Sequence, residues 1–294
     1  MLLVVSAMFV LTRSFGDPRN VYIGDSFNEN ISKERWDALG VALGIDKPMY
    51  VQYVRYVAKL ATGDLGDSIH QRRPVTTLIG ERMPATAKLA LGGFLFMLIT
   101  GIPLGVLAAL TRGGPADYFA RLIAIFGHSA PSFWIAILLV FFFGVKMGWL
   151  PTFGSGGIKH YILPSITLGL GAATGLLRIV RSSMLEVLDS EYIKMARAKG
   201  VNRHWVIWKH ALRNAMISPL TVAGLTLGSL ITGSVLIEVV FAWPGLGTLS
   251  LSSVYQSDFT TVQGVFLIVT LFYVTTSFLV DILYAIVDPR IRYS

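Results

Sequence analysis

The chain has 294 residues, of which 53% are hydrophobic and only 14% are charged. A soluble domain carries about a quarter of charged residues, so this composition excludes an ordinary soluble fold. Cysteine is absent, which excludes disulfides, thiolate metal sites and cysteine catalysis. The formal charge of +8 would suit a nucleic-acid partner, but the basic residues lie mainly beside apolar stretches, and that placement favours membrane topology over nucleic acid.

The first segment, 1–12, is apolar but ends at Arg13, so it is too short to cross a bilayer. We expect the second half of a first span, with a longer product beginning upstream. The segment 13–88 follows as the one sizeable extramembrane region, external by parity. Within it, 48–61 predicts a helix that ends at Gly63. Its expected apolar stripe is Tyr50, Tyr53, Val54 and Val57.

Five later stretches carry no charged side chain and are long enough, or nearly so, to cross a hydrocarbon core of about 30 Å. They are 89–110, 122–145, 161–177, 214–237 and 259–280. Their prolines and glycines would break a soluble helix, but a bundle tolerates them because neighbouring helices satisfy the freed backbone groups. We therefore expect an all-α, polytopic transmembrane helix bundle with six spans, the first truncated. Buried helices of a soluble protein are the weaker alternative.

The stretch 122–145 contains a proline break, in Gly127-His-Ser-Ala-Pro131. Carbonyls freed by a proline are tolerated in a membrane where protein satisfies them or where they face a water-filled cavity. His128, Ser129 and Pro131 are therefore candidate residues of a translocation pathway. A hydrogen-bonded histidine that packs helices together explains His128 equally well.

Other polar and small residues in the spans favour structural roles. Glu238 and Asp281 lie at span ends, where solvation or a neighbouring arginine favours a structural role over a functional one. Glycine pairs spaced by four residues allow helices to approach closely, and packing within one bundle explains them. These pairs are Gly101-x-x-x-Gly105, Gly171-x-x-x-Gly175 and Gly224-x-x-x-Gly228.

The distribution of basic residues predicts the orientation of the chain. The loop 178–213 carries eight basic residues against three acidic ones, so it should be cytoplasmic. The connection 238–258 has two acidic residues and no basic one, whereas the tail 288–294 has two arginines. Both are consistent with that orientation. The loop 146–160 should be external in this orientation, and its two lysines disagree with that assignment.

Motifs for catalysis and energy conversion are missing from the sequence. No Gly-x-x-x-x-Gly-Lys-Ser/Thr loop is present to hold ATP phosphates. The five histidines are scattered, without His-Glu-x-x-His spacing or a nucleophile elbow. The sequence thus predicts no catalytic residue, no metal site and no cofactor in this chain, and any ATP would be bound by another subunit.

The segment 189–214 is the most informative part of the chain. Good helix formers run up to Gly200, which can adopt a positive φ, and Asn202 can cap a second helix. Tyr192, Met195, Ala196 and Lys199 fall at i, i+3, i+4 and i+7, so the first helix presents an apolar knob beside small and charged residues. Such a knob fits a groove in a partner protein, while an amphipathic helix pair on anionic lipid is an equal alternative from periodicity alone.

The sequence motif Glu191-Tyr-x-x-x-Ala-Arg-Ala-Lys-Gly200 resembles the signature loop of ABC-importer permeases. It is most similar to the dipeptide, oligopeptide and nickel permease family, in its B-type subunit. Further segments that resemble this family are Gly63-Asp-Leu-Gly-Asp-Ser68, Pro131-Ser-Phe-Trp134, Glu238-x-x-Phe-x-x-Pro-Gly-Leu-Gly247 and Asp281-x-x-Tyr-x-x-x-Asp-Pro-Arg-Ile-Arg292. Lys194, Met195 and Arg213 depart from the broad importer consensus, which prefers Glu, Ala and Pro there.

The resemblance implies a single permease domain over 1–294, with the loop docked on a cytoplasmic ATPase. The implied ATPase-coupling residues are Glu191, Tyr192, Met195, Ala196, Lys199, Gly200 and Arg203. Implied partners are a second permease subunit, two ATPase subunits that bind ATP and Mg²⁺, and an external substrate-binding protein. The family imports peptides, nickel complexes, glutathione and related solutes across the inner membrane, with the coupling loop and the C-terminus in the cytoplasm.

Two other classes of function compete with this expectation. An ion-coupled secondary carrier should show mid-span charges and an internal inverted repeat, and we find neither in the sequence. A membrane scaffold subunit should not need a two-helix coupling loop. Both alternatives would leave the chain without an ATPase partner.

Overall fold

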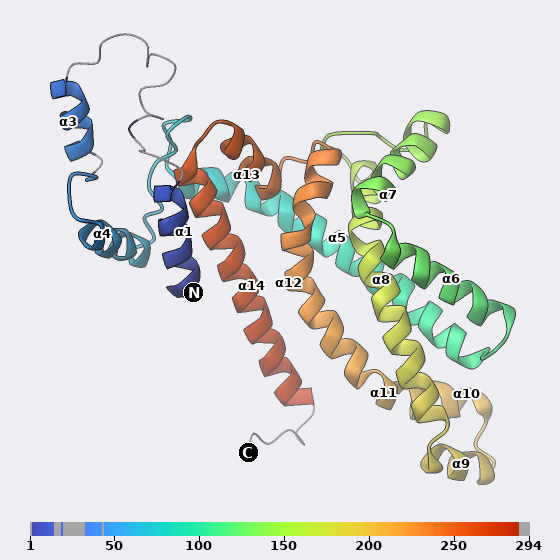
Figure 1. Cartoon of the computed structure of the whole chain (residues 1–294). Coiled ribbons are helices and arrows are strands. Elements are labelled where there is room, and N and C mark those ends of the chain that lie inside the picture. The colour runs from blue at the N-terminus through green and yellow to red at the C-terminus, as the bar shows by residue number, and fades with distance from the viewer. Residues whose placement is uncertain (1, 15–18, 20–32, 43, 288–294) are drawn as a thin grey trace. The chain divides into compact units, whose positions relative to one another are not determined.

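The computed structural model describes residues 2–14, 19, 33–42 and 44–287. These residues are overwhelmingly helical, and their extended pairing is one isolated bridge between Asp67 and Pro74 (Figure 1). They divide into two compact units, 1–84 with 248–271 and 85–247 with 272–294. The all-α fold class is therefore confirmed, whereas the single domain over 1–294 stays a prediction.

In the first unit, α1 (Leu2–Ser14) packs against α4 (Met49–Ala61), and α3 (Lys33–Ala42) lies between them in sequence. The Phe9 ring lies 5.4 Å from the Tyr53 ring, whose hydroxyl hydrogen-bonds Ser6 Oγ at 2.7 Å. Tyr50 and Val54 are instead exposed. The apolar stripe expected on α4 is thus divided between a packed side and an open side.

In the same unit, Asp258 joins two segments that are distant in the sequence. It is buried directly before α14 (Phe259–Val287) and accepts hydrogen bonds from Thr261, at 3.3 Å from the amide and 2.8 Å from the hydroxyl. This is an N-cap, which satisfies a helix amide that has no intrahelical partner. Ser68 Oγ and the Ile69 amide donate to the same carboxylate. One side chain therefore fixes the segment around Ser68 to the start of α14.

Four described helices are long and apolar enough to cross a membrane. They are α5 (Val75–Leu110), α8 (Lys159–Leu188), α12 (Ile217–Val240) and the part 259–280 of α14. Both α5 and α8 extend well past the expected spans 89–110 and 161–177. Charged residues such as Lys88 and Arg178 are good helix formers. Hydropathy consequently marks the apolar centre of a helix and not its ends.

The expected span 122–145 is not one straight helix. The structure has α6 (Pro115–Ser129), then α7 (Ser132–Leu139) with the π-helical η2 (Val140–Lys146), and the two parts meet at 108°. Ala130 is extended, with φ −81° and ψ 132°. A residue before proline avoids the helical region, and the proline itself has no N–H to donate. Pro131 therefore explains the bend, and the pair is either a broken span or a re-entrant segment.

Within the second unit, α8 packs against α6, α7 and α12 (Figure 1). Glycines bring α5 unusually close to α8. A Cβ on Gly101 would lie 2.9 Å from the Ala173 carbonyl oxygen, and one on Gly105 would lie 2.8 Å from the Leu177 carbonyl oxygen. Membrane helices associate through such close contacts because lipid provides no hydrophobic drive between them. The pair Gly101 and Gly105 thus serves packing inside the chain.

Glu238 holds the turn after α12 in place through its carboxylate. Its buried carboxylate accepts hydrogen bonds from Thr86 Oγ1 of α5 at 2.7 Å, from Ser234 Oγ at 3.0 Å and from the Gly247 amide at 2.6 Å. A Cβ on Gly245 would collide with it. The turn before α13 (Leu246–Tyr255) is therefore held on α5 by a buried carboxylate, which is the structural role that the sequence favours for Glu238.

We predict that Gly105→Leu lowers the thermal stability of the purified protein in detergent. The added side chain would collide with the backbone of α8, and overpacking of this kind costs about 1–3 kcal/mol or more. Gly80→Leu is the matched control on the same helix, because nothing lies within 4 Å of a Cβ at Gly80. Equal melting temperatures for the two variants would show that the close crossing does not stabilise the fold.

Candidate coupling site

The segment 189–214 folds as short helices joined at an angle. They are α9 (Glu191–Ala198), α10 (Arg203–Trp205), the π-helical η3 (Val206–Ala211) and α11 (Leu212–Ala215). Gly200 has φ +75°, and the Asn202 side chain accepts a hydrogen bond from the His204 amide at 2.9 Å. The predicted glycine terminus and the predicted asparagine cap are both confirmed.

Ile193 fixes α9 to the rest of the unit. Its side chain is fully buried in a core cluster with Val206 of η3 and with Val180 and Met184 of α8. Burying an isoleucine side chain contributes about 1.5–3 kcal/mol. Sequence reasoning missed this residue, although its apolar character at three residues before Ala196 was the available signal. The loop is thus a packed extension of α8.

Tyr192 and Met195 form the exposed apolar knob of α9, with exposed fractions of 42% and 59%. The Tyr192 hydroxyl accepts a hydrogen bond from Asn214 Nδ2 at 2.8 Å, which ties the knob to α11. Ala196 does not belong to the knob, because it is half-buried against the core cluster. Its small size therefore serves packing within the chain.

The charged residues of the predicted site lie around this knob. Glu191 accepts from Lys194 Nζ at 2.8 Å, one turn along the same helix. Lys199 is exposed beside Gly200, and Arg203 is exposed at the start of α10. The structure therefore brings Glu191, Tyr192 and Met195 onto α9, with Lys199 at its C-cap, and places Arg203 at the start of α10.

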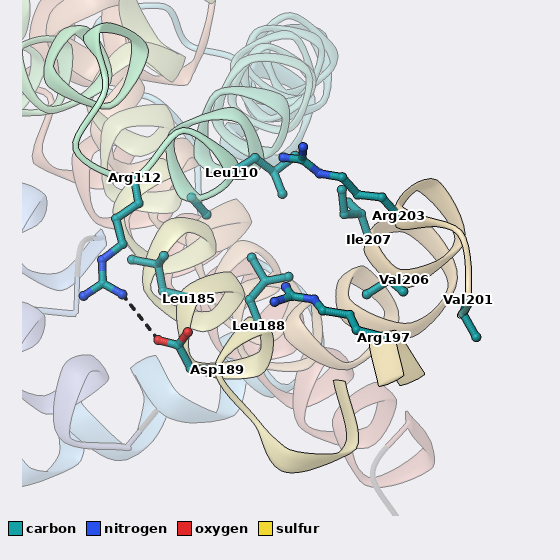
Figure 2. A pocket seen from close by; sticks show the side chains of 11 residues that line it. Leu110, Arg112, Leu185, Leu188, Asp189, Arg197, Val201, Arg203, Val206 and Ile207 are labelled. Carbon is teal, nitrogen blue, oxygen red and sulfur yellow. Dashed lines mark hydrogen bonds and ion pairs between the residues drawn. The ribbon is translucent and has the colours of Figure 1, made fainter. Parts of the chain in front are cut away.

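A cavity of about 490 Å³ lies behind the loop (Figure 2). It is lined by the ends of α5 and α8 and by residues of α9, α10 and η3. Arg112, in the turn after α5, forms an ion pair with Asp189, with a distance of 3.3 Å between Nη1 and Oδ2. Arg197 and Arg203 project into the same space (Figure 2). Sequence spacing gives no sign of this grouping, because Arg112 is far away along the chain.

Asp117 of α6 anchors the part of α8 that leads into the segment 189–214. It is fully buried and pairs with Arg181 of α8, with 2.6 Å between Asp117 Oδ1 and Arg181 Nε. Arg121 donates to the same carboxylate at 2.6 Å, and the Gly113 amide donates at 3.0 Å. The buried carboxylate is thus neutralised by two arginines and hydrogen-bonded by a backbone amide, so it is not left as an unpaired charge in the interior. The pair fixes α6 to the part of α8 that continues into the loop.

The candidate pathway residues lie at the bend between α6 and α7. Ser129 is the last residue of α6 and Pro131 precedes α7; both are exposed. The side chain of His128 lies outside the described part of the structure. Their role in a pathway stays a prediction, as does the role of the seven ATPase-coupling residues.

Comparisons with known proteins agree with this architecture. The family described as "Binding-protein-dependent transport system inner membrane component" matches residues 101–293. The "Glutathione transport system permease protein GsiC" of Escherichia coli O6:H1 (strain CFT073) is 40% identical over 278 residues, covering 95% of this chain and 90% of its own length. The protein of the same name from Salmonella paratyphi A is 42% identical over 251 residues, covering 85% and 82%.

Solved structures show a similar fold at low identity. A chain of the inward-facing MetNI methionine ABC transporter aligns with a TM-score of 0.61 at 23% identity, covering 72% of this chain and 97% of that chain. An amino acid ABC transporter gives a TM-score of 0.56 at 17% identity, covering 71% and 94%. The family match and the relatives, with this fold, show that the chain belongs to the binding-protein-dependent transport system inner membrane components, as a multi-pass permease subunit of an ABC importer.

Proposed function

We propose that this permease forms half of the translocation pathway for glutathione or a related short peptide. The observation that carries the proposal is the identity of 40% to a glutathione transport permease over 95% of this chain. Nickel complexes are the other solutes that the family resemblance implies. The exposed bend residues Ser129 and Pro131 are the candidate contacts with the substrate.

The exposed knob of α9 is the proposed attachment point for an ATPase. Apolar and aromatic side chains such as Met195 and Tyr192 are enriched in protein interfaces, and a flexible methionine adapts to the shape of a groove. The buried Ile193 holds the helix in place while the knob stays exposed. Insertion of the knob into the bilayer surface is less favoured, because a helix of 8 residues with two exposed large apolar side chains offers little surface to the bilayer.

The remaining subunits follow from the same proposal. A second permease would complete the pathway, and an external binding protein would deliver the substrate. Two ATPase subunits would bind ATP and Mg²⁺ and perform the hydrolysis, so this chain would contribute movement and no catalysis. The basic loop 178–213 supports a cytoplasmic position for the coupling helices. The tail 288–294, also proposed as cytoplasmic, lies outside the described residues.

The orientation can be tested by labelling single cysteines. These 294 residues contain no cysteine, so an introduced thiol is the one maleimide target among them, and the reagent used is a maleimide that cannot cross membranes. We predict that Ala198→Cys is protected in intact cells and labelled after lysis, whereas Ser155→Cys is labelled in both cases. Both positions are exposed. Labelling of Ala198→Cys in intact cells would contradict a cytoplasmic coupling loop.

The turn between α9 and α10 gives a second prediction. A side chain at Gly200 has open space, but φ +75° costs most residues about 1–2 kcal/mol, whereas asparagine tolerates it. Gly200→Leu should therefore insert normally and lose ATP-driven transport several-fold, while Gly200→Asn keeps most of it. The measurement is uptake into proteoliposomes of the complete complex. Undiminished transport and ATPase coupling in Gly200→Leu would refute the role of this turn.

Met195 tests the docking surface without changing internal contacts. Met195→Asp places a charge on the knob, so we predict loss of ATPase subunits on co-purification and a fall of at least tenfold in ATP-driven glutathione uptake, about 1.4 kcal/mol or more of interaction. Phe153→Asp is the control, since Phe153 is 60% exposed and Met195 is 59% exposed. Unchanged co-purification of Met195→Asp would refute docking at the knob. Glutathione uptake without ATP, driven by an ion gradient, would refute the coupling as a whole.

A further inference from the structure

The cavity behind the coupling loop carries an excess of positive charge. Three arginines line it, Arg112, Arg197 and Arg203, against the single carboxylate of Asp189, so the lining has a net charge of 3 − 1 = +2. Arg112 is the arginine that pairs with Asp189. Arg197 and Arg203 form no ion pair with any residue that the structure describes.

These two guanidinium groups enter the cavity from different helices. Arg197 comes from the last turn of α9 and Arg203 from the first residue of α10, and both side chains extend toward the space between α5 and α8 (Figure 2). A guanidinium presents its donors in a fixed planar fork that matches carboxylate and phosphate oxygens. Two such forks facing one space form a binding site for an anion.

The rest of the lining is aliphatic. Leu110 of α5, Leu185 and Leu188 of α8, and Ile207 of η3 supply aliphatic surface around the two arginines (Figure 2). The volume of about 490 Å³ falls within the roughly 300–1,000 Å³ of small-molecule sites. The cavity therefore suits an amphiphile with an anionic head and a hydrocarbon part.

The position of the cavity favours a lipid as the source of that amphiphile. Ala109 and Leu110 line the cavity and are the last residues of the apolar run 89–110 of α5, so on that side the cavity adjoins the expected end of a membrane span. Leu185 and Leu188 belong to the part of α8 that continues past its apolar run 161–177. Basic pockets between membrane helices on the cytoplasmic side bind phospholipid head groups. An acidic side chain of an ATPase would pair with the arginines but would leave the aliphatic surface in water.

We infer that this cavity binds the phosphate of an anionic phospholipid through Arg197 and Arg203. The aliphatic surface takes the first part of the lipid chains. The bound lipid bridges α9 and α10 to the ends of α5 and α8, so it braces the coupling loop against the bundle. The inference rests on the proposed function only for the cytoplasmic side of the loop.

The test compares lipid retention by variants of the complete complex. The complex is reconstituted in nanodiscs of phosphatidylcholine with a minor fraction of phosphatidylglycerol, and native mass spectrometry after release counts the phosphatidylglycerol that stays on the permease. Arg197→Gln with Arg203→Gln should lower retention by about tenfold or more, because each hydrogen bond to a charged group contributes about a factor of ten. Arg197→Lys with Arg203→Lys should keep part of it.

Arg213→Gln is the matched control, since Arg213 is exposed on the same loop and does not line the cavity. Wild-type retention in the glutamine pair would overturn the inference. Displacement of the lipid by soluble glycerol phosphate at low concentration would also overturn it and identify a free anion. Retained lipid with lost ATPase subunits would assign both arginines to the ATPase. The readout needs neither ATP nor substrate, so a failure of the proposed transport function would leave its result unchanged.

Discussion

The close crossing of α5 and α8 is the contact on which the other features of the second unit depend. Gly93 and Gly169 face one another there, and a Cβ on either would meet the other helix. Because lipid gives helices no hydrophobic reason to associate, this approach and the core around Met97 hold the pair together. The same core continues through Met184 to Ile193, so the position of the coupling helix is set by the helix crossing.

Sequence reasoning was most accurate where a single residue type has one physical use. Gly200 and Asn202 were predicted as a helix end and a cap, and the structure shows both. Sequence reasoning failed where the surroundings of a residue depend on contacts with residues far away in the chain. Periodicity placed Ala196 on the same face of α9 as Tyr192 and Met195, but it could not show that Ala196 packs against the core cluster while the other two side chains stay exposed. Likewise, hydropathy found an apolar run around Pro131 but could not show that two helices meet there at 108°.

The part that this subunit plays in the importer follows from its family and from the packing of its helices. Its family membership sets aside the ion-coupled carrier and the scaffold as alternatives. Buried charges are used in pairs or hydrogen-bonded, as with Asp117 and Arg181, so they stiffen the unit near the loop. Because α8 contacts α6, α7 and α9, these helices would carry a push on the knob to the bend at Pro131 under the proposed function. The coupling loop and the candidate pathway residues are thus joined through α8.

The buried carboxylate of Glu238 also has a consequence for biogenesis. Its partner Thr86 lies 152 positions earlier in the chain, and the N-terminal part of a chain leaves the ribosome first. At synthesis rates of about 5–20 residues per second, α5 waits several seconds or more before α12 emerges. During that interval Thr86 lacks its final acceptor. The turn between α12 and α13 therefore forms late in synthesis. In a nascent chain arrested before Glu238, the contact with Thr86 could not form, and this part of the fold would be open to quality-control proteases.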